Sequence, residues 1–319
     1  MWGSCRGGEG REGLRLTPDV AGNLLRSPAL LHPPLLHPVL PAHAFPSPPL
    51  PSSTTPQPTP AHRLLPVFNF IHPVPRIPVP SPLLSRTETQ AVKWAEAIVA
   101  EALPQRTNIR KEDPGKLSQV GYNAGKLNRP AFHWAKNLTG RKRDVTAVAQ
   151  MDVKCSSVFA LLWQMVRSRL PKEVINDFDT FLTQLGIRRM DGSGQMASEG
   201  SSGTYSVVLG DATFDFHNVE LAPPAGIFGQ NYSRGIHFEY QPHLFGLAWT
   251  LSCNKGPDAG GNFFMAKYGL RIEAAANALV FWMPREWHGT SLLDHSPYDA
   301  APDFIQRGAA IVTPNRIVS

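Results

Sequence analysis

Cysteine is scarce in this chain of 319 residues, which has only Cys5, Cys155 and Cys253. An odd number of widely spaced thiols excludes a dense disulfide framework and favours a reducing compartment. The first residues, 1–15, lack the apolar run of a secretory signal. Proline interrupts the leucine-rich pieces between 24 and 36 too often for a membrane span. We therefore expect an intracellular protein without a membrane segment.

Proline is distributed unevenly. Residues 1–86 contain 19 of the 31 prolines, which leaves 12 (31 minus 19) for the other 233 positions. Repeated proline removes amide donors, forbids helix interiors and favours polyproline II. The composition therefore predicts a disordered proline-rich arm over 1–86, with the folded part of the chain after it.

The positive charge is concentrated in one segment. Residues 106–143 hold ten Lys or Arg against Glu112 and Asp113, a local charge of +8 (10 minus 2) within a chain total of +6. The aromatic residues Tyr122, Phe132 and Trp134 are interleaved with these cations, a mixture that suits a nucleic acid. A solvated surface is the alternative interpretation. Arg141–Arg143 is also a candidate nuclear-import signal, which would make the location nuclear.

Apolar periodicity divides the remaining chain into two regions. Helical spacing from Thr87 to Pro104, over Ser156–Leu170 and from Pro171 to Gly186 predicts a helical support region over 87–200, which contains the basic segment. From 201 to 319, seven or eight short strands without a long helix predict a β-sandwich, jelly roll or related barrel. The fold class expected is α+β.

The strongest functional signal is the pair His237-Phe238-Glu239 together with His288. In an extended strand, residues i and i+2 point to the same face, so His237 and Glu239 can grip one ion. His288 follows Glu239 by 49 residues (288 minus 239), enough for strands to run out and return. Two imidazoles and one carboxylate are the ligand set of a non-haem Fe(II) site.

The order of these motifs resembles the double-stranded β-helix of the Fe(II)/2-oxoglutarate-dependent dioxygenases over about residues 200–319. The resemblance is carried by the His-x-Glu pair, Gly260-Gly261-Asn262-Phe263-Phe264, the apolar run 278–282, His288-Gly289-Thr290-Ser291 and the run 307–312. It is closest to the prolyl-hydroxylase and TET/JBP-like branches and to a fungal group with His-x-Glu-x-Gln-Pro and Trp-His-Gly-Thr-Ser-Leu. Glu239 stands where most members have Asp.

The resemblance implies a site as well as a fold. It makes His237, Glu239 and His288 the iron ligands, and Arg307 the cation that holds the distal carboxylate of 2-oxoglutarate, with Arg316 as the fallback. A guanidinium matches a carboxylate bidentately and stays charged when buried. Tyr232 is a candidate hydroxyl donor to the same carboxylate. Among the aromatic residues, Trp249, Phe264 and Trp282 are candidate pocket walls.

Three functions are compatible with these residues. The first is a dioxygenase that couples decarboxylation of 2-oxoglutarate with oxygen to hydroxylation of a C–H group, in a nucleic-acid base, a protein side chain or a metabolite. A duplex base would have to be flipped out of the stack to reach the metal. The second is a non-catalytic nucleic-acid-binding or scaffold protein with a degenerate β-helix core. The third is a zinc hydrolase that uses the same ligands.

Overall fold

The computed structural model describes residues 86–140, 144–194, 202–296, 299 and 302–318. All of them belong to one compact unit, His72–Ser319. The predicted proline-rich arm and the candidate nuclear-import signal, 141–143, lie outside the described residues. The described part has mixed α+β structure, and every strand pairing in it is antiparallel.

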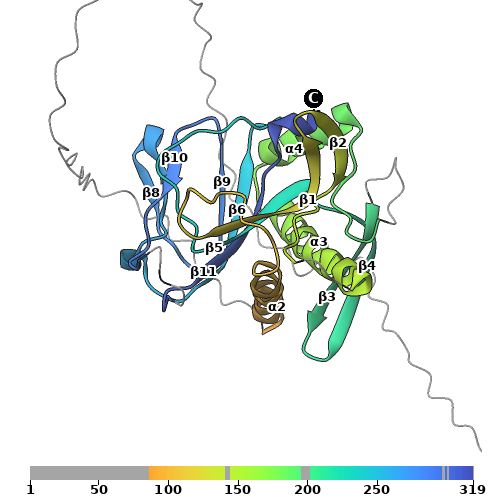
Figure 1. Ribbon diagram of the computed structural model, residues 1–319, viewed down its shortest axis with the longest axis horizontal. Helices are drawn as coiled ribbons and strands as arrows, with labels where there is room; N and C mark the ends of the chain where they lie inside the picture. The colour runs from red at the N-terminus through yellow and green to blue at the C-terminus, as the bar shows by residue number, and fades with distance from the viewer. Residues whose placement is uncertain (1–85, 141–143, 195–201, 297–298, 300–301, 319) are drawn as a thin grey trace, which may run out of the picture. The chain divides into compact units, whose positions relative to one another are not determined.

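A six-stranded sheet forms the centre of the fold (Figure 1). Its strands, in spatial order, are β2 (Arg129–Trp134), β1 (Lys116–Lys126), β5 (Ala225–Gln230), β11 (Gln306–Ile311), β6 (Gly246–Cys253) and β9 (Ala278–Trp282). A second sheet has the order β10 (His288–Thr290), β7 (Phe263–Met265) and β8 (Leu270–Ile272). The hairpin of β3 (Ser202–Leu209) and β4 (Ala212–Glu220) pairs only with itself among the described strands.

Three α-helices occur in the described residues: α2 (Arg86–Ala102), α3 (Val145–Arg167) and α4 (Lys172–Leu185). Asp144 caps α3 because its carboxylate accepts the amide of Thr146 at 2.9 Å. Proline precedes α4 at Pro171, and Gly186 ends that helix in the left-handed conformation with φ of 57°. Short 3-10 turns occur at Pro257–Ala259, Ala266–Tyr268 and Asn315–Val318.

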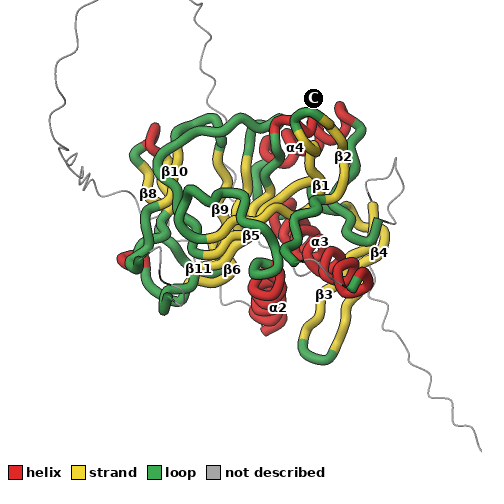
Figure 2. Tube along the Cα trace, viewed as in Figure 1, coloured by secondary structure: helices red, strands yellow, loops and turns green. Residues whose placement is uncertain are grey.

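The main core lies between the helices and one face of the six-stranded sheet. Figure 2 shows α2 and α3 below the central strands. Phe159 of α3 stacks on Phe228 of β5 with ring centroids 5.0 Å apart, and both side chains are fully buried. Gly226 permits this contact, because a Cβ there would lie 2.4 Å from the Phe159 ring. Trp163 and Trp249 belong to the same cluster. The helices therefore cover one face of the sheet.

The secondary-structure predictions hold for most elements. The helices expected from Thr87 and from Pro171 are confirmed, as are short strands without a long helix over 201–319. The start expected for the middle helix, Ser156, is wrong by eleven residues, because Asp144 supplies the cap and the helix begins at Val145. The range predicted as helical support also contains the hairpin of β1 and β2, which extends the central sheet.

One described helix, α3, is long and apolar enough to cross a membrane by length and composition. Its fully buried side chains, including Val158, Phe159 and Trp163, pack in the core cluster. The core helix of a globular domain has the same composition, so α3 is weak evidence for a span. The described residues form no closed barrel.

Candidate metal centre

The two histidines lie directly opposite each other on paired backbone segments. The amide of His237 donates to the carbonyl of His288, and the amide of His288 donates to the carbonyl of His237, both at 2.8 Å. Residues of such a pair project to the same face. Their ring centroids are accordingly 4.4 Å apart. Segments 51 residues apart in the chain (288 minus 237) are thus joined at the histidines themselves.

Glu239 completes the cluster from the same face, two residues after His237. Its amide donates to the carbonyl of Pro284 at 2.8 Å, which holds the segment extended along its neighbour. Its Oε1 lies 3.8 Å from Nε2 of His237. One ligand atom from each of His237, Glu239 and His288 lies within 4.8 Å of the others. The three predicted ligands therefore converge.

Backbone carbonyls orient both imidazoles. Nδ1 of His237 lies 2.8 Å from the carbonyl of Gly235, and Nδ1 of His288 lies 2.8 Å from the carbonyl of Glu286. Because a carbonyl only accepts, we infer that each Nδ1 carries the proton. Each Nε2 then offers a lone pair, as a metal-binding histidine requires. The carbonyls thus supply the outer partners of a metal site.

Burial keeps these histidines neutral. It lowers the pKa of His237 and of His288 below the usual value, against the opposing effect of the carbonyl that each ring faces. The His288 side chain is 3% exposed, whereas His237 and Glu239 are half-buried. A neutral imidazole binds a cation without first losing a proton.

Apolar rings surround the inner histidine. The Trp282 and Phe263 ring centroids each lie 5.7 Å from that of His288. Met265, 7% exposed, pairs with His288 across β7 and β10. Gly289 allows the chain to pack closely, because a Cβ there would lie 2.9 Å from the carbonyl of Arg234. These contacts keep water from one side of the cluster.

Two arginines lie on the other side of the cluster, at Glu239. Arg234 Nη1 is 2.7 Å from Glu239 Oε1, and Arg110 Nη2 is 3.4 Å from the same oxygen. Arg234 also reaches Asp113, with Nε 3.5 Å from Oδ2. This network fixes the rotamer of the carboxylate, as partners of metal-binding carboxylates do.

Tyr232, one of the predicted cofactor contacts, belongs to this network. Its hydroxyl donates to Oδ2 of Asp113 at 2.7 Å. Burial, and then the hydrogen bond to that carboxylate, raise the pKa of Tyr232. Its hydroxyl is therefore a neutral donor, connected to Glu239 by three contacts that run through Asp113 and Arg234.

Arg307, the other predicted cofactor contact, contacts the helical side of the central sheet. Its guanidinium forms an ion pair with Glu96 of α2, and its Nε donates to Gln230 Oε1 at 2.8 Å. Arg316, the fallback, lies in the turn after β11, with Nη1 3.4 Å from the carbonyl of Gly125. The guanidiniums that form ion pairs with Glu239 of the cluster are instead those of Arg234 and Arg110.

The candidate wall residues have separate positions. Trp282 is beside His288, whereas Trp249 is buried in the helix-covered core and donates to Asn277 Oδ1 at 2.9 Å. Phe264 pairs with Gly289 and Arg271, and it is the neighbour of Met265, the residue that pairs with His288. Its side chain therefore points to the opposite face of the sheet from His288. Of these three rings, Trp282 is the one in contact with the cluster.

Sequence reasoning missed Arg110, Asp113 and Arg234. Arg110 and Asp113 lie in the basic segment, which was interpreted as a whole by its charge. One signal in the sequence could have revealed Arg234. It lies three residues before His237, and a carboxylate ligand such as Glu239 needs a hydrogen-bond partner nearby. The donor set fits a divalent transition metal, because two neutral imidazoles and a carboxylate suit Fe(II) or Zn(II).

Comparisons with known proteins do not identify a family for this chain. No protein-family model and no curated protein matches the sequence. Among solved structures, IDO from Bacillus thuringiensis is 8% identical over 72% of this chain and 86% of that chain, with a TM-score of 0.30. A similarity at that score carries no inference about this chain.

Proposed function

We propose that this chain is an Fe(II)- and 2-oxoglutarate-dependent dioxygenase. The observation that carries the proposal is the convergence of His237, Glu239 and His288 on one face of two paired segments. Two histidines and one carboxylate on one face leave the remaining metal positions open to small ligands, as in non-haem iron oxygenases. A structural zinc site would instead use four protein ligands.

We also propose that the two sheets form a double-stranded β-helix, or jelly roll. Counting the His237 segment as a strand, the eight strands from β5 to β11 alternate between the two sheets in chain order, except that β7 and β8 are consecutive and both lie in the smaller sheet. The central sheet then takes strands 1, 8, 3 and 6, and the smaller sheet takes 2, 7, 4 and 5. This order is that of a jelly roll with two Greek keys. It supports the predicted fold of the catalytic core.

Bound iron would supply the activation of oxygen and the oxidative decarboxylation of 2-oxoglutarate. The protein's own groups position and protect this chemistry. The carbonyls of Gly235 and Glu286 hold the imidazoles in the tautomer that binds metal. Arg234 holds the carboxylate of Glu239 in one orientation. Trp282 and Phe263 exclude water beside His288.

The carboxylate of 2-oxoglutarate needs a cation, and two arginines compete for this role. Arg307 is the candidate from the sequence, and it would have to exchange its partner Glu96 for the keto acid. Arg110 is the candidate from geometry, because it is 38% exposed and its guanidinium is 3.4 Å from Glu239. An exposed guanidinium beside a metal ligand can bind a carboxylate without breaking a short ion pair. Proximity favours Arg110.

For the substrate of hydroxylation and for the cellular location, we propose only a general class. The basic, aromatic segment supports a nucleic-acid base as the substrate, and Tyr232 remains a proposed donor near the site. An intracellular location, nuclear if residues 141–143 act as an import signal, stays a prediction.

The test is turnover of 2-oxoglutarate by the full chain. Protein freed of metal with a chelator should form succinate only when Fe(II), 2-oxoglutarate and oxygen are all added. His288→Ala should abolish succinate formation, whereas His217→Ala, which changes an exposed histidine of β4, should leave it intact. Thermal unfolding of both variants checks that they fold.

Other outcomes would reject the proposal. Metal binding without succinate, but with zinc-dependent hydrolysis in the absence of oxygen, would favour a hydrolase. Failure of the folded wild-type chain to bind Fe(II) or Zn(II) would favour the non-catalytic scaffold.

A further inference from the structure

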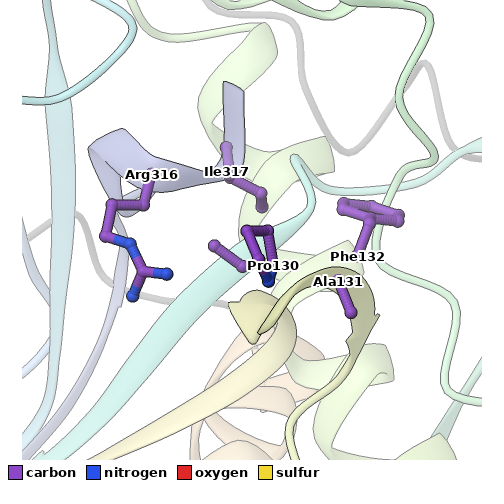
Figure 3. Close-up of a pocket in the computed structure, with 6 residues that line it drawn as sticks. Pro130, Ala131, Phe132, Arg316 and Ile317 are labelled. Carbon is purple, nitrogen blue, oxygen red and sulfur yellow. The ribbon is translucent and has the colours of Figure 1, made fainter. Parts of the chain in front are cut away.

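A cavity of about 230 Å³ lies at the far end of the β1–β2 hairpin from the metal centre. Figure 3 shows it between the hairpin residues Pro130, Ala131 and Phe132 and the C-terminal turn. That turn contributes Arg316 and Ile317, and Ala124 of β1 completes the lining. A concave site with apolar walls and a cation suits a flat ligand that carries negative charge.

Phe132 is an aromatic platform at this cavity. Its ring stacks on that of Tyr122 with centroids 4.5 Å apart and planes 10° apart. Trp134 packs edge-on against the same Tyr122 at 5.4 Å. Tyr122 is buried, whereas Phe132 is 40% exposed. One face of the Phe132 ring is therefore supported from below, while the side chain remains accessible for stacking.

The charge around Phe132 is positive. From Pro114 to Gly140 the sequence contains no Asp or Glu. Lys126 and Arg129 flank the hairpin turn, and both are exposed. Arg188, also exposed, lies near Tyr122, as does the carboxylate of Asp191. With Arg316, cations from three parts of the chain surround the stacked rings, as a polyanion requires.

Only part of the basic segment belongs to this surface. Arg106 is 1% exposed and pairs with Asp152 at 2.7 Å, and Arg110 contacts Glu239 at the metal centre. The segment 106–143 is therefore not one continuous binding face. Among its described cations, Arg106 lies in the core, Arg110 lies at the metal centre, and Lys126 and Arg129 lie at the hairpin.

We propose that the surface formed by Lys126, Arg129, Phe132 and Arg316, the hairpin surface, binds single-stranded nucleic acid. A base would stack on Phe132 in the cavity, and neighbouring phosphates would contact the cations. Stacking on an exposed ring needs a base that is not already stacked in a duplex, which favours a single strand. Charge alone would suit any polyanion, but the supported aromatic ring favours a ligand with bases.

This surface is distinct from the metal centre. The Lys116 end of β1 pairs with Gln230, just before the Tyr232 network, and the cavity lies at the other end of the strand. Eleven residues of strand span roughly 30 Å. Binding at the hairpin surface therefore does not require the proposed oxygenase activity, and each can fail without the other.

The test uses the full chain and a fluorescein-labelled single-stranded DNA of about 12 nucleotides, a length that covers a typical binding site. Affinity is measured by anisotropy over a range of salt concentrations. Four variants are compared: the double variant Lys126→Gln/Arg129→Gln, Phe132→Ala, Phe132→Leu, and the double variant Lys154→Gln/Lys172→Gln, which removes two exposed cations from α3 and α4.

The hairpin double variant should lower the salt dependence by about 1.4 in the slope of log affinity, since each lost phosphate contact on a single strand changes it by about 0.7. Phe132→Ala should weaken binding by roughly 5- to 150-fold with the slope unchanged. The helix double variant should bind like the wild type. Phe132→Leu, which keeps apolar packing on Tyr122, should also weaken binding.

Three results would overturn the proposal. The first is that the wild-type chain does not bind the DNA at low salt. The second is wild-type affinity in both Phe132 variants while heparin or anionic phospholipid vesicles compete fully, which would indicate a surface for polyanions in general. The third is an equal loss in the helix double variant, which would indicate binding by net charge alone.

Discussion

The helix-covered face of the central sheet and the paired segments that carry His237 and His288 differ in nearly every physical respect. The first buries large apolar side chains completely, including Phe228 and Trp249. The second has one buried ligand, His288, and two half-buried ligands on one face, and exposed apolar residues on the other: Ile236, Phe238, Tyr240 and Trp287 are 41–62% exposed. Packing on the first face stabilises the fold, so the second can be arranged for chemistry.

The largest effect on stability should follow loss of a core ring. Phe228→Ala removes a fully buried side chain that stacks on Phe159, so we expect it to lower the free energy of unfolding by about 3–5 kcal/mol. Phe238→Ala, its matched control on the metal-bearing segment, should cost less than about 1 kcal/mol because that ring is 41% exposed. Denaturant unfolding measures both. Equal losses would remove the distinction between the two regions.

The next effect should appear when the pH is lowered. His243 packs between the rings of Phe178 and Phe181, and burial lowers its pKa to about 4. The unfolded chain binds this proton near pH 6.5, before the folded chain does. Stability from this group is thus fully present above about pH 6.5 and is lost as the pH falls to about 4, by roughly 3 kcal/mol.

Unfolding at pH 7 and at pH 4 checks this effect. His243→Gln, which can still donate to the carbonyl of Phe245, should show a smaller pH dependence than the wild type. Carboxylates elsewhere titrate alike in both proteins. The same pH dependence in both would contradict the role given to His243.

A smaller effect is expected from the two arginines proposed to bind 2-oxoglutarate. Arg110 lies at the metal centre, and Arg307 lies on the helical side of the central sheet. Arg110→Gln should raise the half-saturating concentration of 2-oxoglutarate by about 10- to 150-fold, as expected for loss of a hydrogen bond to a charged group. Arg307→Gln should raise it less, because that guanidinium contacts Glu96 on the helical side. Steady-state succinate formation measures both. The reverse order would assign the carboxylate to Arg307, the residue predicted from the sequence.

The smallest effect concerns protons at the metal centre. Because burial lowers the pKa of His237 and His288, protons should compete with metal only below the usual histidine value of about 6.5. Co(II) affinity, measured by absorption between about pH 8 and pH 5.5, should therefore stay level down to about 6.5. A steady decline that begins above neutral pH would show that the imidazoles are not held neutral by burial.

The fold was predictable where local signals were strong. The apolar spacing of α4, with Pro171 before it and Gly186 after it, defines that helix without tertiary information. The hairpin of β1 and β2 was not predicted, because Gly121 and Gly125 interrupt the alternation and adopt positive φ. The spacing of apolar residues along the sequence cannot show that such a segment pairs with the edge of a sheet.

The candidate site was likewise predictable only in part. His237 and Glu239 could be predicted as a ligand pair because they are two residues apart in an extended segment. The structure brings His288 to them. The contact between Arg110 and Glu239 spans 129 positions of sequence and leaves no local pattern. Arg307 illustrates the same limit, since nothing in its neighbours reveals Glu96, 211 residues earlier.

Metal titration tests the central claim most directly, because the whole account rests on three side chains holding one cation. Isothermal titration of the metal-free full chain with Mn(II) should show a single site. His237→Ala and His288→Ala should each lose it, while His217→Ala should keep it and all three variants should remain folded. Unchanged Mn(II) affinity in the folded His237 and His288 variants would contradict the proposed centre.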